Sequence, residues 1–249
     1  MTYSAIMKIS TLLLSLISAL PALAGEVLIP AVFRGPGAFG SVWRTEIVLS
    51  NVSTQPSFPV RSTVTFHPTG GGTPTSIEIL TSPMETYAIH DAVFEWFSVV
   101  EGNGIVRVTW DEPNAHITTR ARIYNVSSGG EFGQEVPGLS LDALQFDNYL
   151  PGVSGVDGNR TNIGVSNPHD TEVGFWVELF DTSGLSRGAF RTVVPPRSYR
   201  PFNDIFAHFQ AGPLNAAMVR VLAVEKPVYA YASIVRADTG DATFVTPAR

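Results

Sequence analysis

The chain contains no cysteine, very little lysine, and no long apolar run beyond its N-terminal segment. Without cysteine it can form neither disulfides nor thiolate metal sites, so its fold must rest on a hydrophobic core. The net charge of −6 argues against the basic surface that nucleic-acid binding needs. The same charge argues against electrostatic attachment to anionic lipid.

The N-terminal segment has the parts of a cleavable secretory signal. An apolar run from Ile9 to Leu23 follows Lys8 and ends beside a small-residue cleavage site, Ala22-Leu23-Ala24. The run is shorter than the roughly 20 apolar residues of a membrane span, although an uncleaved anchor is the alternative. We therefore expect residues 1–24 to be a signal peptide. A disulfide-free exported chain indicates a bacterial protein of the periplasm or the exterior, without a membrane span after cleavage.

The rest of the chain reads as two related halves. Residues 43–53 are WRTEIVLSNVS, and residues 159–169 are NRTNIGVSNPH. Both copies are followed by the same order of short alternating apolar segments and turn residues, which is typical of β-sandwiches. We predict an all-β fold with two tandem antiparallel β-sandwich modules, residues 25–128 and 148–249. Helical turns are expected only at 91–97 and 205–210.

The segment between the two modules, residues 129–147, is rich in glycine and also contains proline. These residues favour turns. We therefore predict a linker or a long edge loop there.

The second module also carries a family resemblance. Its segments VVPPRSYRPFND at 193–204 and KPVYAYASIVR at 226–236 resemble the sensory rhodopsin transducer-like β-sandwich domain. That resemblance implies a compact sandwich prone to self-association, but no signalling role, because this chain is expected to be exported. The first module departs from the pattern, with His90-Asp91 in place of Phe-Asn-Asp. The whole chain also resembles bacterial secreted proteins built from tandem β repeats.

Two stretches match catalytic motifs by letter only. Residues 35–40, GPGAFG, fit the dinucleotide pattern G-x-G-x-x-G, and residues 184–188, GLSRG, fit the nucleophile pattern G-x-S-x-G. Each of these motifs works only when a helix follows it. Here a strand is predicted after both, so Ser186 is a turn residue. We predict no catalytic residue and no cofactor, and the protein is expected not to be an enzyme.

Metal binding is not predicted either. None of the five histidines shows the H-x-H or H-E-x-x-H spacing, and each is expected in a turn or on the surface. The segment Asp238-Thr-Gly-Asp241 could offer two carboxylates to Ca²⁺, but a calcium shell needs six to eight oxygens. A hairpin turn is the better interpretation.

Six residue pairs recur at equivalent places in the two modules. They are Arg44/Arg160, Thr45/Thr161, Asn51/Asn167, Tyr87/Tyr199, Asp91/Asp204 and Arg107/Arg220. They could form one ligand pocket per module. The simpler interpretation is architecture, with arginine–aspartate pairs between strands and asparagines that start turns. On that interpretation Arg160→Ala lowers stability.

The ligand-binding candidates are Trp176, Tyr199, Asp204 and Arg160. Trp176 is expected on the outward side of its strand, where another module or subunit would cover it or a sugar ring would stack on it. The sequence thus predicts a secreted, non-catalytic structural or interaction protein of the bacterial envelope or exterior. A protein partner or self-association is expected. The alternative is a carbohydrate-binding module with a glycan ligand.

Overall fold

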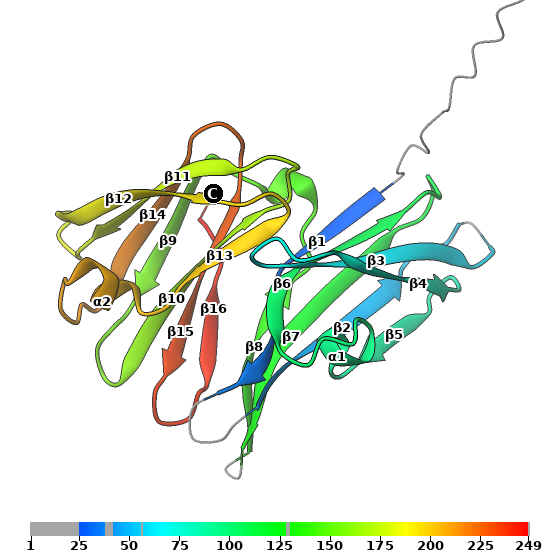
Figure 1. Ribbon diagram of the computed structural model, residues 1–249, viewed down its shortest axis with the longest axis horizontal. Coiled ribbons are helices and arrows are strands. Elements are labelled where there is room, and N and C mark those ends of the chain that lie inside the picture. The colour runs from blue at the N-terminus through cyan, green and yellow to red at the C-terminus, as the bar shows by residue number, and fades with distance from the viewer. Residues whose placement is uncertain (1–24, 38–41, 56, 128–129, 249) are drawn as a thin grey trace, which may run out of the picture.

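The computed structural model describes residues 25–248, apart from 38–41, 56 and 128–129. The fold is all-β and its sheets are antiparallel, as predicted (Figure 1). Figure 1 shows two β-rich halves side by side. Within the described residues, no helix has the length and apolar character needed to cross a membrane.

The first half forms one eight-stranded sheet in which β1 joins two groups of strands. Residues Gly25 to Arg34 of β1 pair with β6, whereas Gly35 and Pro36 pair with β2. The groups are β4-β3-β6-β1 and β2-β7-β8, with β5 also paired to β2, and one hydrophobic core draws residues from both. The strands are β1 (Gly25–Pro36), β2 (Val42–Asn51), β3 (Val60–Pro68), β4 (Thr75–Thr81), β5 (Thr86–Ile89), β6 (Gly102–Trp110), β7 (Ile117–Ser127) and β8 (Gly130–Pro137).

The second half repeats this strand order. Its two sheets run β12-β11-β14-β9 and β13-β10-β15-β16, so β9 stands where β1 stands in the first half, β10 where β2 stands, and so on to β16. A separate hydrophobic core is shared by these two sheets. The strands are β9 (Asp147–Val153), β10 (Asn159–Asn167), β11 (Val173–Phe180), β12 (Ser186–Val194), β13 (Ser198–Phe202), β14 (Ala217–Ala223), β15 (Tyr229–Arg236) and β16 (Ala242–Val245).

Strand β11 shows how the sequence pattern produces this architecture. Phe175, Val177 and Leu179 are fully buried, whereas Trp176 between them is 44% exposed. Alternation of this kind is the signature of a strand with one face on the core. The Phe175 ring meets the Phe202 ring edge-on at 6.2 Å, which ties the two sheets of the second half together.

The two predicted helical turns are confirmed. They are α1 (Ala92–Glu95) and α2 (Ile205–Phe209), and each follows an aspartate. The Asp204 side chain accepts a hydrogen bond from the Ala207 N–H at 3.2 Å, which caps the first turn of α2.

The segment predicted as a linker, residues 129–147, contains strand β8 and the short 3₁₀ turn η2 (Leu141–Ala143). β8 pairs with β7 along its length. Two glycines of the segment 129–147 allow close packing against β7. A Cβ at Gly133 would come within 2.4 Å of the Ile123 carbonyl oxygen, and a Cβ at Gly138 within 2.2 Å of Thr119 Oγ1. Turn-forming residues therefore led the prediction to miss a strand.

The two halves are packed against each other. Tyr229 and Tyr231 of β15 contribute to the hydrophobic core of the first half. Hydrogen bonds also join the two halves. Ser166 Oγ donates to the Pro30 carbonyl at 2.5 Å, and Ser233 Oγ donates to Gln134 Oε1 at 2.7 Å. Because buried aromatic rings cross the boundary, the relative placement of the halves is fixed by packing.

His67 corrects one expectation, because it lies inside the protein instead of on the surface. It is buried on β3, and its Nε2 has no hydrogen-bond partner. Burial, and then the positive charge of Arg107, lower the pKa of the His67 imidazole to about 4. The folded protein therefore holds this side chain neutral at pH values where the unfolded chain would protonate it.

This shift predicts a pH-dependent stability. The contribution of neutral His67 to the free energy of unfolding is complete above pH 6.5, the usual pKa of histidine. It is lost as the pH falls from there through the folded-state pKa. Between pH 7 and pH 5 the loss should be about 2 kcal/mol. Urea unfolding of the wild type and of His67→Gln at both pH values measures it. Equal pH dependence in the two proteins would contradict the assignment.

Candidate functional site

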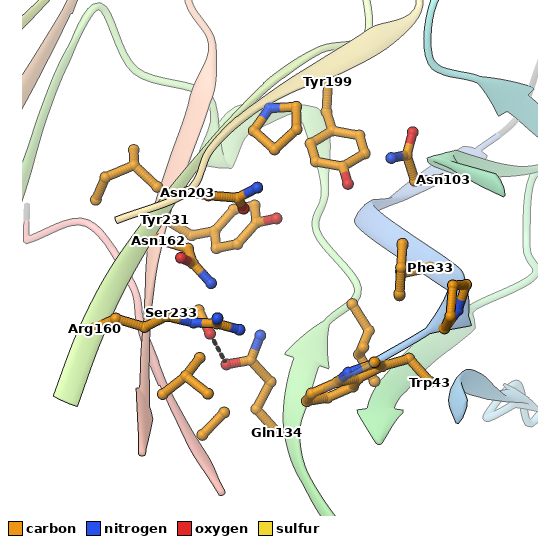
Figure 2. A pocket seen from close by; sticks show the side chains of 17 residues that line it. Phe33, Trp43, Asn103, Gln134, Arg160, Asn162, Tyr199, Asn203, Tyr231 and Ser233 are labelled. Carbon is orange, nitrogen blue, oxygen red and sulfur yellow. Dashed lines mark hydrogen bonds between the residues drawn. The ribbon is translucent and has the colours of Figure 1, made fainter. Parts of the chain in front are cut away.

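A cavity of about 460 Å³ lies between the two halves and is lined by residues of both. Figure 2 shows Phe33 and Trp43 on the side of the first half, and Tyr199 and Tyr231 on the side of the second. Cavities of this size, with aromatic walls and a few polar groups, are typical of small-molecule sites. The cavity is therefore the candidate binding site of the protein.

The two tyrosines contribute hydroxyl groups as well as rings. Burial raises the pKa of Tyr199, and burial also holds the pKa of Tyr231 well above its usual value. Both hydroxyls thus stay protonated at neutral pH. Neither has a hydrogen-bond partner among the described residues, so both can donate to a ligand.

The other polar groups of the lining are mostly amides. Asn162 Oδ1 accepts a hydrogen bond from the Asp204 N–H at 3.1 Å, and Gln134 Oε1 accepts one from Ser233 Oγ. The NH₂ groups of Asn162 and Gln134 have no acceptor among the described residues, so they remain uncommitted. The described lining contains no aspartate or glutamate. The polar wall is accordingly rich in hydrogen-bond donors.

Arg160 is the one charged residue of the described lining. Its side chain is solvent-exposed and has no hydrogen bond, ion pair or ring contact with any described residue, whereas the side chain of every other described arginine has at least one. Its counterpart in the first half, Arg44, has Nε 3.6 Å from Asp91 Oδ2. The prediction of a structural ion pair is therefore wrong for Arg160.

The difference between the two arginines follows from the two aspartates. In the first half, Asp91 faces Arg34 and Arg44, and its carboxylate accepts two hydrogen bonds from Arg34 Nε at 3.1 and 3.0 Å. In the second half, Asp204 adopts a left-handed backbone and turns its carboxylate to the first turn of α2. This leaves the Arg160 guanidinium without an internal carboxylate.

Other recurring pairs do the same structural job in both halves. Thr45 Oγ1 donates to the Phe33 carbonyl and accepts from the Phe33 N–H, both at 2.8 Å. Thr161 Oγ1 makes the same two bonds to Ser154, at 2.7 and 3.2 Å. Both threonines are fully buried. For this pair the structural interpretation of the repeat is correct.

The two arginines of the recurring pair Arg107/Arg220 also have equal roles. Arg107 forms two parallel hydrogen bonds with the Glu26 carboxylate, at 2.8 and 2.6 Å. Arg220 forms the same two bonds with Asp147, at 2.8 and 2.7 Å. The hydrogen bond from Arg220 lowers the pKa of the Asp147 carboxyl. Each pair connects the first strand of its half to the neighbouring strand in the same sheet.

The four sequence candidates do not form one site. Arg160 and Tyr199 both line the cavity. Asp204 caps α2 and reaches the cavity indirectly, through its hydrogen bond to Asn162. Trp176 lies on the outer face of β11, beside a separate hollow of about 230 Å³, where it is 44% exposed.

Sequence reasoning missed Trp43, Tyr231, Gln134, Asn162 and Asn203 as lining residues. Trp43 stands directly before the recurring Arg-Thr, and Asn203 directly before Asp204. Their positions directly beside recurring residues could therefore have marked Trp43 and Asn203 as candidate lining residues. Gln134 lies in the segment predicted as a linker and gave no such indication.

The stretches that match catalytic or calcium motifs belong to strands and turns wherever the structure describes them. Residues 38–41 of the glycine-rich stretch lie outside the described residues, and strand β2 begins at Val42. Ser186 was expected in the turn but is the first residue of strand β12, and its Oγ donates to Glu178 Oε1 at 2.9 Å. Asp238 lies in the turn of the β15–β16 hairpin, paired with Arg236. The described residues contain no group of three or more histidine or acidic side chains placed to hold a metal.

A scan against protein-family models gives no match, and no curated protein or solved structure matches the chain. The resemblance of residues 193–204 and 226–236 to the transducer-like domain stays a prediction. Function is therefore argued from the geometry of the cavity.

Proposed function

We propose that the chain is an exported, non-catalytic binding protein that holds a glycan unit in the cavity between its halves. The observation that carries this proposal is the combination of aromatic rings and uncommitted polar groups on the cavity wall, contributed by both halves. Flat aromatic faces suit the apolar face of a sugar ring, and amide and hydroxyl groups suit its hydroxyls. Export would bring the protein to the compartments where extracellular glycans occur.

Binding is favoured over catalysis by the chemistry of the lining. General acid–base chemistry needs a group that exchanges a proton near neutral pH. The described lining offers no carboxylate or imidazole, and the pKa values of Tyr199 and Tyr231 are raised away from neutrality. An arginine guanidinium stays charged throughout the physiological range. These groups can orient a ligand but are poorly suited to transform it.

Trp43→Leu tests the proposal in the mature full-length chain. We expect glycan binding, followed by tryptophan fluorescence or calorimetry over a panel of oligosaccharides, to weaken about 10-fold or more, because the stacking surface is lost. Trp176→Leu is the matched control, since Trp176 lies outside the cavity. If Trp176→Leu abolishes binding while Trp43→Leu leaves it intact, the site is on the outer face. If the wild type binds no glycan of the panel, the proposal fails.

A second candidate function is protein interaction through the outer face of the sheet β12-β11-β14-β9. Trp176 is 44% exposed there, and Tyr149 and Leu222 lie on the same sheet, so the face offers aromatic and apolar side chains, beside Glu178 and Arg220, to a partner or a second copy. Sedimentation of the purified chain over a wide concentration range tests self-association. A monomer at every concentration would exclude it.

A further inference from the structure

The cavity also indicates which class of glycan it would bind, an inference that depends on the proposed function. We infer that the ligand is an acidic sugar, that Arg160 binds its carboxylate, that Trp43 contacts its ring and that the tyrosine hydroxyls donate to its oxygens. The inference depends on three features of the cavity: an unpaired charge, the orientation of two amides, and the position of the aromatic rings relative to both.

The unpaired charge belongs to Arg160. Its guanidinium has no partner among the described residues, and the described lining contains no acidic side chain that could neutralise it. A guanidinium presents a planar set of N–H donors that match a carboxylate in two parallel hydrogen bonds. Arg107 and Arg220 form such pairs inside the protein. Arg160 is left to form one with a ligand.

The orientation of two amides adds to this preference. The carbonyl oxygens of Asn162 and Gln134 are occupied by the Asp204 N–H and by Ser233 Oγ. Their NH₂ groups have no acceptor among the described residues and are available to a ligand as donors. Figure 2 shows Arg160, Asn162, Ser233 and Gln134 gathered on one part of the cavity wall. A cluster of donors with one positive charge favours a ligand group that only accepts, and a carboxylate is such a group.

The first half of the chain provides an internal comparison. There the equivalent arginine, Arg44, has a carboxylate oxygen of Asp91 3.6 Å from its Nε. In the second half Asp204 is turned to the helix α2, and the cavity opens beside Arg160. A ligand carboxylate would take the role at Arg160 that Asp91 has at Arg44.

The aromatic rings distinguish an acidic sugar from a simple inorganic anion. Trp43 lies across the cavity from Arg160, and Tyr231 borders the same space (Figure 2). A phosphate or sulfate ion could occupy the donor cluster but would leave the Trp43 ring without a ligand contact. A hexuronic acid carries a carboxylate at one end of an otherwise sugar-like ring. It can therefore contact the donor cluster around Arg160 and the aromatic ring of Trp43 at the same time.

Calorimetric titration of the mature chain with trigalacturonate and with its neutral counterpart, galactotriose, tests the inference. We expect trigalacturonate to bind more tightly, and its affinity to fall as salt is added. Arg160→Gln should weaken trigalacturonate binding about 10- to 100-fold and leave galactotriose binding nearly unchanged. The matched control, Arg191→Gln, removes an exposed arginine 3.9 Å from Glu225 and outside the cavity, and it should bind like the wild type.

The outcomes separate this inference from the proposed function. Equal affinity for the two trisaccharides, unchanged in Arg160→Gln, would overturn the acidic ligand while keeping the cavity as a glycan site. Binding of an N-acetylated tripeptide with a free C-terminus, without binding of trigalacturonate, would overturn the claim that the ligand is a sugar. It would keep only the claim that Arg160 binds a carboxylate. No glycan binding at all would overturn the proposed function as well. Urea unfolding of Arg160→Gln should match the wild type, because Arg160 has no internal partner to lose.

Discussion

Replacing Asn167 by alanine is expected to lower the free energy of unfolding by about 3 to 5 kcal/mol. Asn167 is fully buried at the end of β10. Its NH₂ group donates to the carbonyls of Thr171, Val194 and Pro195 at 2.8, 3.3 and 2.9 Å, and its Oδ1 accepts from the His169 N–H at 2.9 Å. Alanine would leave several of these backbone groups unpaired, each at a cost of about 1 to 3 kcal/mol.

Urea unfolding of Asn167→Ala, compared with Asn51→Ala, measures this effect. Asn51 holds the same place in the first half but makes two hydrogen bonds, to the Thr81 carbonyl and from the Ser53 N–H. Its loss should therefore be smaller than that of Asn167. The exposed Asn114 is the control, and its replacement should cost less than about 0.5 kcal/mol. A loss below 1 kcal/mol for Asn167→Ala would show that the buried network is not needed.

The second large effect is expected for Arg107→Ala, about 3 kcal/mol of unfolding free energy. Arg107 and Glu26 are only 18% and 12% exposed, and two hydrogen bonds join them. The hydrogen bond with Glu26 raises the pKa of the Arg107 guanidinium. Removing the arginine would leave the Glu26 carboxylate in the interior without its partner. That uncompensated charge, more than the loss of the ion pair itself, causes the destabilisation.

The matched control for this prediction is Arg61→Ala. Arg61 also pairs with a glutamate on the neighbouring strand, Glu78, but their side chains are 64% and 59% exposed. Exposed pairs of this kind contribute less than about 1 kcal/mol. Thermal or urea unfolding of both variants gives the comparison. Equal losses would mean that the burial of the Arg107–Glu26 pair has no energetic consequence.

Much of the fold could be predicted because its determinants are local. Alternation of apolar and polar residues predicts β11, and the two short helical turns α1 and α2 lie within the segments expected for them. The duplicated segments at 43–53 and 159–169 became β2 and β10, which have the same strand neighbours in their halves. Period-two patterns are readable from adjacent residues, which is why the strand predictions were correct.

The candidate site could be predicted only in part, because it depends on how the two halves pack. Arg160 and Tyr199 were chosen as repeat residues, yet nothing in the sequence places Trp43 and Gln134 across from them. Arg160 has no ion pair with Asp204 because the left-handed backbone of Asp204 turns its carboxylate to α2. A comparison of the two repeat sequences does not reveal this backbone conformation. A strand that carries glycines, such as β8, looks like a loop until its partner strand is known.

A crystal structure of the mature chain grown with trigalacturonate tests the central claim most directly. We predict electron density for the sugar between the two halves, with a carboxylate against the Arg160 guanidinium and a ring against Trp43. Sugar bound only at the Trp176 face, or an empty cavity at saturating ligand, would contradict the account.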